Sequence, residues 1–109
     1  MKKWQEKVID VAEELEWSVT IENNWFEFEK HSPAGEDFIF SINVSSLKQF
    51  QEYLTEFHET FDRENHVFEL LEAKRNGFVG VPDLDTLVED SKDIENMLKE
   101  LAEKVAKIK

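Results

Sequence analysis

Large apolar side chains alternate with polar ones in three separate runs between residues 19 and 44. The last run is the clearest, because single residues separate Phe38, Phe40, Ile42 and Val44. Successive side chains of a strand point to opposite faces, so a period of two predicts strands with one buried face. The chain is therefore expected to contain a sheet that is apolar on one face only.

Two turn sequences separate these runs. Asn23-Asn24 lies between the first and the second, and asparagine tolerates the positive φ that a tight hairpin requires. Residues 32–36, Ser-Pro-Ala-Gly-Glu, separate the second from the third. The pattern predicts a three-stranded antiparallel meander with Glu22, Glu27 and Glu29 on its polar face.

Apolar residues with a period near 3.6 flank the meander and predict helices. The first is expected over 2–16, and another begins at Ser46, with Gln49 three residues later as in a capping box. Asp62 is expected to start a further segment, which Asn76-Gly77 ends. The last helix is expected to start at Pro82 and Asp83.

Two details of the C-terminal half follow from the same patterns. The apolar connector 78–82 is expected to pack in the core, and Asp90-Ser91 could restart the last helix. The order α-β-β-β-α-α-α predicts a single α+β domain over 1–109, with a three-stranded antiparallel meander and two or three C-terminal helices packed on one sheet face.

Charge restricts the partners of the chain. It has 25 acidic and 13 basic residues, a formal net charge of −12, and residues 8–100 hold 23 of the acids but only 7 of the bases. Such a surface repels nucleic acid and anionic membranes and attracts basic proteins. We therefore expect a basic protein surface as partner, with no direct nucleic-acid or membrane binding.

The candidate partner-binding residues are acidic, apart from one tryptophan. Carboxylates at alternate strand positions recur about every 6.6 Å, comparable to the phosphates of one nucleic-acid strand. Trp25 stands among them, and tryptophan is frequent at binding hot spots, although it could instead be folded under a loop. The candidates are Glu22, Trp25, Glu27, Glu29, Glu36 and Asp37, with Glu52, Glu56 and Glu59 on a helix as further carboxylates.

No catalytic pattern is present, and we expect neither an enzyme nor a cofactor. The chain has no cysteine, and its three glycines do not form a phosphate-binding loop. His58 and His66 are eight residues apart and could hold a metal with Glu59 or Glu69, but only if one helix runs unbroken through Asp62. No metal site is therefore predicted. The absence of cysteine and of a long apolar run fits the cytoplasm of a bacterial host cell.

Three stretches resemble small acidic proteins of phages and mobile elements of Gram-positive bacteria: residues 32–38, residues 76–82 and the segment from Leu87 to Leu98. In size, acidity and lack of catalytic residues, the chain is also similar to anti-CRISPR and antirestriction proteins. This resemblance implies a non-enzymatic inhibitor that occupies the basic nucleic-acid groove of a bacterial defence nuclease, and a Cas9-type effector is the expected target.

A second function remains open at this point. The apolar stripe from Leu84 to Ile108 is longer than one sheet is expected to cover. The alternative is a homodimeric interaction or regulatory module of a mobile element, without nucleic-acid mimicry. A small metal-dependent enzyme built on His58 and His66 is the third hypothesis.

Overall fold

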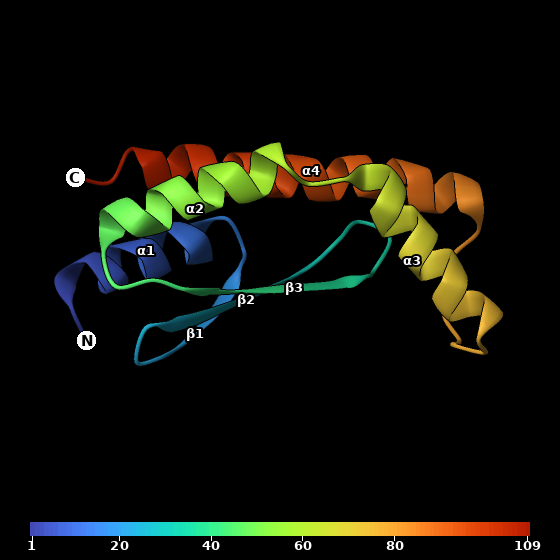
Figure 1. Cartoon of the computed structure of the whole chain (residues 1–109), viewed down its shortest axis with the longest axis horizontal. Coiled ribbons are helices and arrows are strands. Elements are labelled where there is room, and N and C mark those ends of the chain that lie inside the picture. The colour runs from blue at the N-terminus through green and yellow to red at the C-terminus, as the bar shows by residue number, and fades with distance from the viewer.

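Helices and strands follow one another in the expected order in the computed structural model, which describes residues 1–109 (Figure 1). The α+β class and the antiparallel meander, with strand order β1-β2-β3, are thereby confirmed. The elements are α1 (Lys3–Glu14), β1 (Ser18–Glu22), β2 (Trp25–His31), β3 (Asp37–Asn43), α2 (Leu47–Glu59), α3 (Arg63–Arg75) and α4 (Leu84–Ala106).

The strand register places every second residue in the core. Glu22 pairs with Trp25 across the two-residue turn, in which Asn23 adopts a φ of 56°, as predicted for a tight hairpin. Phe26 pairs with Ile42 and Phe28 with Phe40, and all four are buried. Their side chains share one face of the sheet, which the helices cover.

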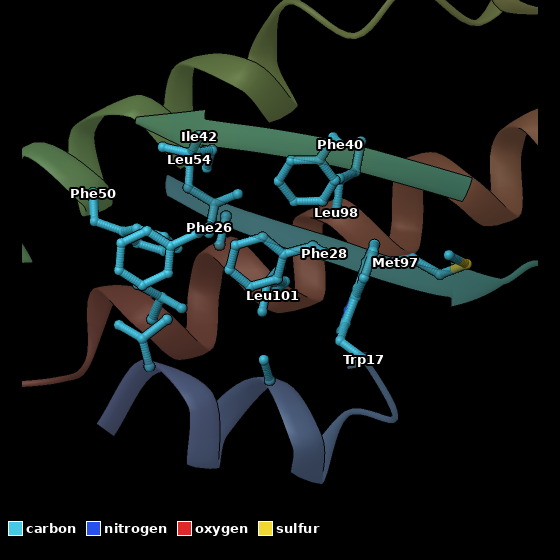
Figure 2. Packing of buried hydrophobic residues seen from close by; sticks show 14 of the residues in the cluster. Trp17, Phe26, Phe28, Phe40, Ile42, Phe50, Leu54, Met97, Leu98 and Leu101 are labelled. Carbon is cyan, nitrogen blue, oxygen red and sulfur yellow. The ribbon is translucent and has the colours of Figure 1, made fainter. Parts of the chain in front are cut away.

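Aromatic side chains pack against one another and against aliphatic side chains in the core between sheet and helices (Figure 2). The rings of Phe28 and Phe40 stack with centroids 5.0 Å apart, and Phe57 of α2 stacks on Phe40 at 4.9 Å. Trp17, which the sequence patterns did not single out, packs edge-on against Phe40 at 5.5 Å and is 2% exposed. Its position follows from the end of α1, where Glu16 takes a φ of 70° and turns the chain back under the sheet.

Helix α4 runs along the longest dimension of the molecule, which is 44 Å (Figure 1). Its 23 residues span roughly 35 Å, whereas a strand of seven residues spans roughly 23 Å. The sheet is therefore too short to cover α4, and α3 packs against the part that remains. Val67 of α3 and Leu87 of α4 are both buried there. No helix in the structure is both long enough and apolar enough to span a bilayer.

Helix boundaries follow the predicted capping residues. Ser46, Asp62 and Asp83 each accept a hydrogen bond from the backbone N–H three residues later. Gly77, with a φ of 91°, follows the last turn of α3, and the Phe78 N–H donates to the Ala73 carbonyl. This pattern of bonds is a Schellman motif. The Gln49 side chain accepts from Ser45, not Ser46, so the predicted capping box is shifted by one residue.

Two predictions about the C-terminal half are wrong. The connector after Gly77 does not enter the core: Phe78 is 69% and Val79 86% exposed, because α3 carries the loop beyond the end of the sheet. Helix α4 also runs unbroken through Asp90 and Ser91 instead of restarting there. Both residues are buried, and Asp90 accepts hydrogen bonds from Ser32 Oγ at 2.6 Å and from the Ala34 N–H at 3.0 Å.

Candidate partner-binding surface

One face of the sheet carries no helix, and we call it the outer face. Its residues alternate with the buried or half-buried residues of the other face along each strand, and nearly all of them are exposed. The register aligns Glu29 with Ser18 and Ile39, Glu27 with Thr20 and Ser41, and Trp25 with Glu22 and Asn43. The outer face therefore comprises Ser18, Thr20, Glu22, Trp25, Glu27, Glu29, His31, Asp37, Ile39, Ser41 and Asn43.

Negative charge on the outer face is not neutralised by lysine or arginine. It contains four of the predicted carboxylates: Glu22, Glu27, Glu29 and Asp37. Lys30 is the only lysine of the three strands, and it lies on the opposite side, where its Nζ donates to the Leu15 carbonyl at 2.6 Å. Only His31 pairs with one of these carboxylates, that of Asp37, and both side chains are well exposed.

Two large apolar side chains interrupt the acidic surface. Trp25 is 54% exposed, so it is not folded under a loop. Ile39 is 50% exposed and lies directly across from Glu29. Sequence reasoning missed Ile39 as a surface residue, although the alternation had already placed Phe38 and Phe40 on the other face. The outer face thus combines carboxylates with two separate apolar contacts.

Glu36 lies apart from the other candidate residues. Its carboxylate contacts Nε2 of His66 at 3.0 Å, which joins the β2–β3 turn to α3. Both side chains are largely buried. The hydrogen bond to Glu36 raises the pKa of His66, burial opposes this, and the charges of Glu36, Glu69 and Asp90 add to the increase. Glu36 therefore supports the turn and is not a free carboxylate of the outer face.

The carboxylates predicted on a helix belong to a different part of the surface. Glu52, Glu56 and Glu59 are exposed on α2, which packs on the inner face of the sheet through Phe50 and Phe57. Glu52, Glu56 and Glu59 border a shallow hollow of about 480 Å³. The structure therefore separates the two predicted rows of carboxylates into two acidic surfaces.

The histidines do not meet the geometric condition for the metal hypothesis. Helix α2 ends at Glu59 and α3 starts at Arg63, so no single helix joins His58 to His66. His66 contacts Glu36 instead. No group of three or more histidine, aspartate or glutamate side chains comes together in a geometry that could hold a metal ion.

The outer face offers carboxylates for electrostatic attraction and two exposed apolar side chains for contact with a partner. Comparison of the chain with models of protein families, with curated proteins and with solved structures finds no match. The arrangement of residues on this surface is therefore the basis for inferring a function.

Proposed function

We propose that this protein is a non-enzymatic inhibitor that binds the basic nucleic-acid groove of a bacterial defence nuclease through its outer face. A Cas9-type effector is the target class that the sequence resemblance suggests. One observation carries the proposal: an uncovered sheet face holds four carboxylates and an exposed tryptophan, with no lysine or arginine among them.

Charge complementarity supports this choice of partner. A groove that holds a phosphate backbone is lined by arginine and lysine. Carboxylates at a spacing comparable to that of phosphates would interact favourably with these positive charges. Glu27 and Glu29 are two residues apart on β2, which separates them by about 6.6 Å along the strand. Their strand is held in place by neighbours on both sides, so the carboxylates are presented by a rigid element.

Trp25 supplies the apolar part of the interaction. Tryptophan buries a large area at a low cost in side-chain entropy, and it is enriched among hot spots. Its position beside Glu22, and two residues from Glu27, surrounds it with carboxylates that would form the polar rim of an interface.

The test is binding to an RNA-loaded Cas9-type effector, with and without target DNA, at about 50 and about 300 mM NaCl. We expect a complex that weakens with salt and excludes DNA. The double variant Glu27→Lys/Glu29→Lys should weaken binding by at least about a hundredfold, because close interfacial charges couple by about 1.5–7 kcal/mol.

A matched control separates this surface from net charge. The variant Glu100→Lys/Glu103→Lys makes the same change in charge on exposed positions of α4 and should bind like the wild type. Equal losses for the two double variants would mean that only overall charge matters. Unchanged affinity after reversal at Glu27 and Glu29 would show that the outer face is not the binding surface.

One observation favours the alternative, a homodimeric interaction or regulatory module. Exposed apolar side chains occur in the connector after α3 and in the first two turns of α4, and Phe68 is exposed on α3 itself. We call those of the connector and of α4 the apolar tip: Phe78, Val79, Leu84 and Val88. A second copy of the chain could cover this tip, and a monomer mass that does not change with concentration would exclude this function.

A further inference from the structure

Strand β3 forms a free edge of the sheet. The strand order is β1-β2-β3, so only β2 pairs with β3 (Figure 1). No side chain, and no backbone bond outside the sheet, satisfies an N–H or C=O group of residues 37–43. The backbone groups of β3 that point away from β2 therefore have no partner within the protein.

The register identifies these groups. The N–H of Val44 donates to the Asn24 carbonyl, which continues the hydrogen-bonded pairs of β2 and β3. Hydrogen-bonded and non-hydrogen-bonded pairs alternate along an antiparallel ladder, so Phe40 and Ile42 bond toward β2. Ile39 and Ser41 then direct their N–H and C=O groups outward from the sheet.

The two sides of this edge differ chemically. On the outer face, Ile39 and Ser41 lie one strand away from Glu29 and Glu27, and Asp37 lies on β3 itself. On the helix side, the ring of Phe57 stacks on Phe40, and that of Tyr53 stacks on Phe57. Tyr53 is 43% exposed and, with Phe57, lines a small hollow of about 150 Å³. An added strand would meet carboxylates on one side and aromatic rings on the other.

We infer that the free edge of β3 binds an extended segment, with alternating basic and apolar residues, as a fourth strand of the sheet. Strand addition obtains affinity from backbone hydrogen bonds and specificity from alternate side chains. The inference rests on the proposed function and deepens it, because it specifies which feature of the partner the acidic surface recognises.

Charge also decides between this occupant and a second copy of the chain. A second copy would bring another net charge of −12 to an edge already flanked by Asp37, Glu27 and Glu29. A basic segment neutralises these carboxylates. The free edge of β1 is less suitable, because β1 has five residues where β3 has seven, and α1 packs beside it.

The probe is a capped octapeptide of alternating lysine and valine, added to the isotope-labelled full-length chain. We expect binding in which hydrogen exchange at the Ile39 and Ser41 amides slows by at least about tenfold. An octapeptide of alternating glutamate and valine is the charge control, and it should not bind.

N-methylation of the peptide tests the pairing itself. In antiparallel addition, which we propose here, Ile39 and Ser41 form hydrogen-bonded pairs with the residues directly opposite them, and opposite residues share a face. Lysines over the acidic outer face therefore direct their N–H groups toward β3. Methylating the lysine amides should abolish binding, whereas methylating the valine amides should leave it unchanged. Both methylated peptides have the same charge, so a purely electrostatic interaction would not distinguish them.

A pair of protein variants tests the same backbone hydrogen bonds by changing β3 instead of the peptide. Ser41→Pro removes one outward N–H at a position where an edge strand tolerates proline, and Ser41→Ala keeps that N–H. The first should weaken peptide binding about three- to tenfold and the second should not. Circular dichroism of Ser41→Pro checks its fold, and the methylated peptides test the wild type independently of any variant.

Several outcomes would overturn the inference. Equal binding of the two methylated peptides would exclude strand addition but leave the proposed function intact, since that function is tested by reversal at Glu27 and Glu29. Failure of the lysine peptide to bind, or equal binding of the glutamate peptide, would show that the edge does not select a basic segment. Protection of the Ile39 and Ser41 amides that increases with protein concentration alone would identify a second copy instead.

Discussion

At the scale of single residues, His66 is a titratable group held between aromatic rings and a carboxylate. Its ring packs against Phe38 and Phe61, with centroids 5.9 and 5.6 Å away, and its Nε2 contacts Glu36. The hydrogen bond to the Glu36 carboxylate raises the pKa of His66 above 6.5, although burial opposes the shift. Protonation of this histidine therefore strengthens the link between the β2–β3 turn and α3.

This shift predicts a pH-dependent stability. Because the folded-state pKa exceeds 6.5, the contribution is fully present below pH 6.5 while Glu36 remains ionised, and it is lost as pH rises through the folded-state pKa. Below pH 6.5, the free energy of unfolding of the wild type should exceed that of His66→Gln by about 1–2 kcal/mol, and this difference should shrink as the pH rises.

Urea denaturation across this pH range measures the difference. The control is His31→Gln, because His31 and its partner Asp37 are 71% and 57% exposed and an exposed pair contributes little. If the difference in unfolding free energy between wild type and His66→Gln does not change with pH, the effect does not come from protonation of His66.

At the scale of elements, Asp90 fixes the β2–β3 turn to α4. Its carboxylate, 4% exposed, accepts hydrogen bonds from Ser32 Oγ and from the Ala34 N–H, residues more than fifty positions earlier in the chain. Ser32 Oγ in turn accepts from the Glu36 N–H. The turn is thus held by α4 through Asp90 and by α3 through the contact of His66 with Glu36. These two contacts fix the position at which β3 begins.

We predict that Asp90→Ala lowers the free energy of unfolding by about 2–3 kcal/mol, because it leaves the buried Ser32 hydroxyl and the part-buried Ala34 N–H without their carboxylate acceptor. Glu89→Ala is the control: Glu89 is the preceding residue, is exposed and makes only a surface ion pair with Lys92. The midpoints of urea denaturation measure the stability of both variants, provided that the dependence of the unfolding free energy on urea concentration is unchanged. Similar losses for the two would show that Asp90 contributes no more than a surface carboxylate does.

At the scale of the whole molecule, the acidic outer face and the apolar tip lie in separate regions (Figure 1). The elongated shape, 44 by 23 by 21 Å, follows from α4, which extends past the sheet and pairs with α3 there. The net charge of −12 opposes self-association, whereas the exposed Phe78 and Val79 favour it.

The homodimer function predicts a mean mass in sedimentation equilibrium that rises with protein concentration. Phe78→Ser/Val79→Ser should abolish this rise, and it should change the free energy of unfolding by less than about 0.5 kcal/mol, because both side chains are exposed. Ser18→Ala, on the outer face, is the control and should retain the rise. A rise in mass that survives the double variant would place the contact elsewhere.

The sequence by itself determined the secondary structure and the two faces of the sheet. Periods of 2 and 3.6 are local properties of strands and helices, and Ser46, Asp62 and Asp83 cap their helices through bonds only three residues away. For the same reason the alternation of β2 correctly placed Trp25, Glu27 and Glu29 opposite the core.

Only the tertiary structure decided which polar groups are free and which apolar groups are covered. The sequence predicted Glu36 as a partner-binding carboxylate and Asp90 as the start of a new helical segment, yet partners distant in the chain largely bury both. Phe78 and Val79 read as core residues, yet α3 carries them past the end of the sheet. Burial depends on where separate elements meet, and that geometry is set by packing over the whole chain, beyond the reach of any local pattern.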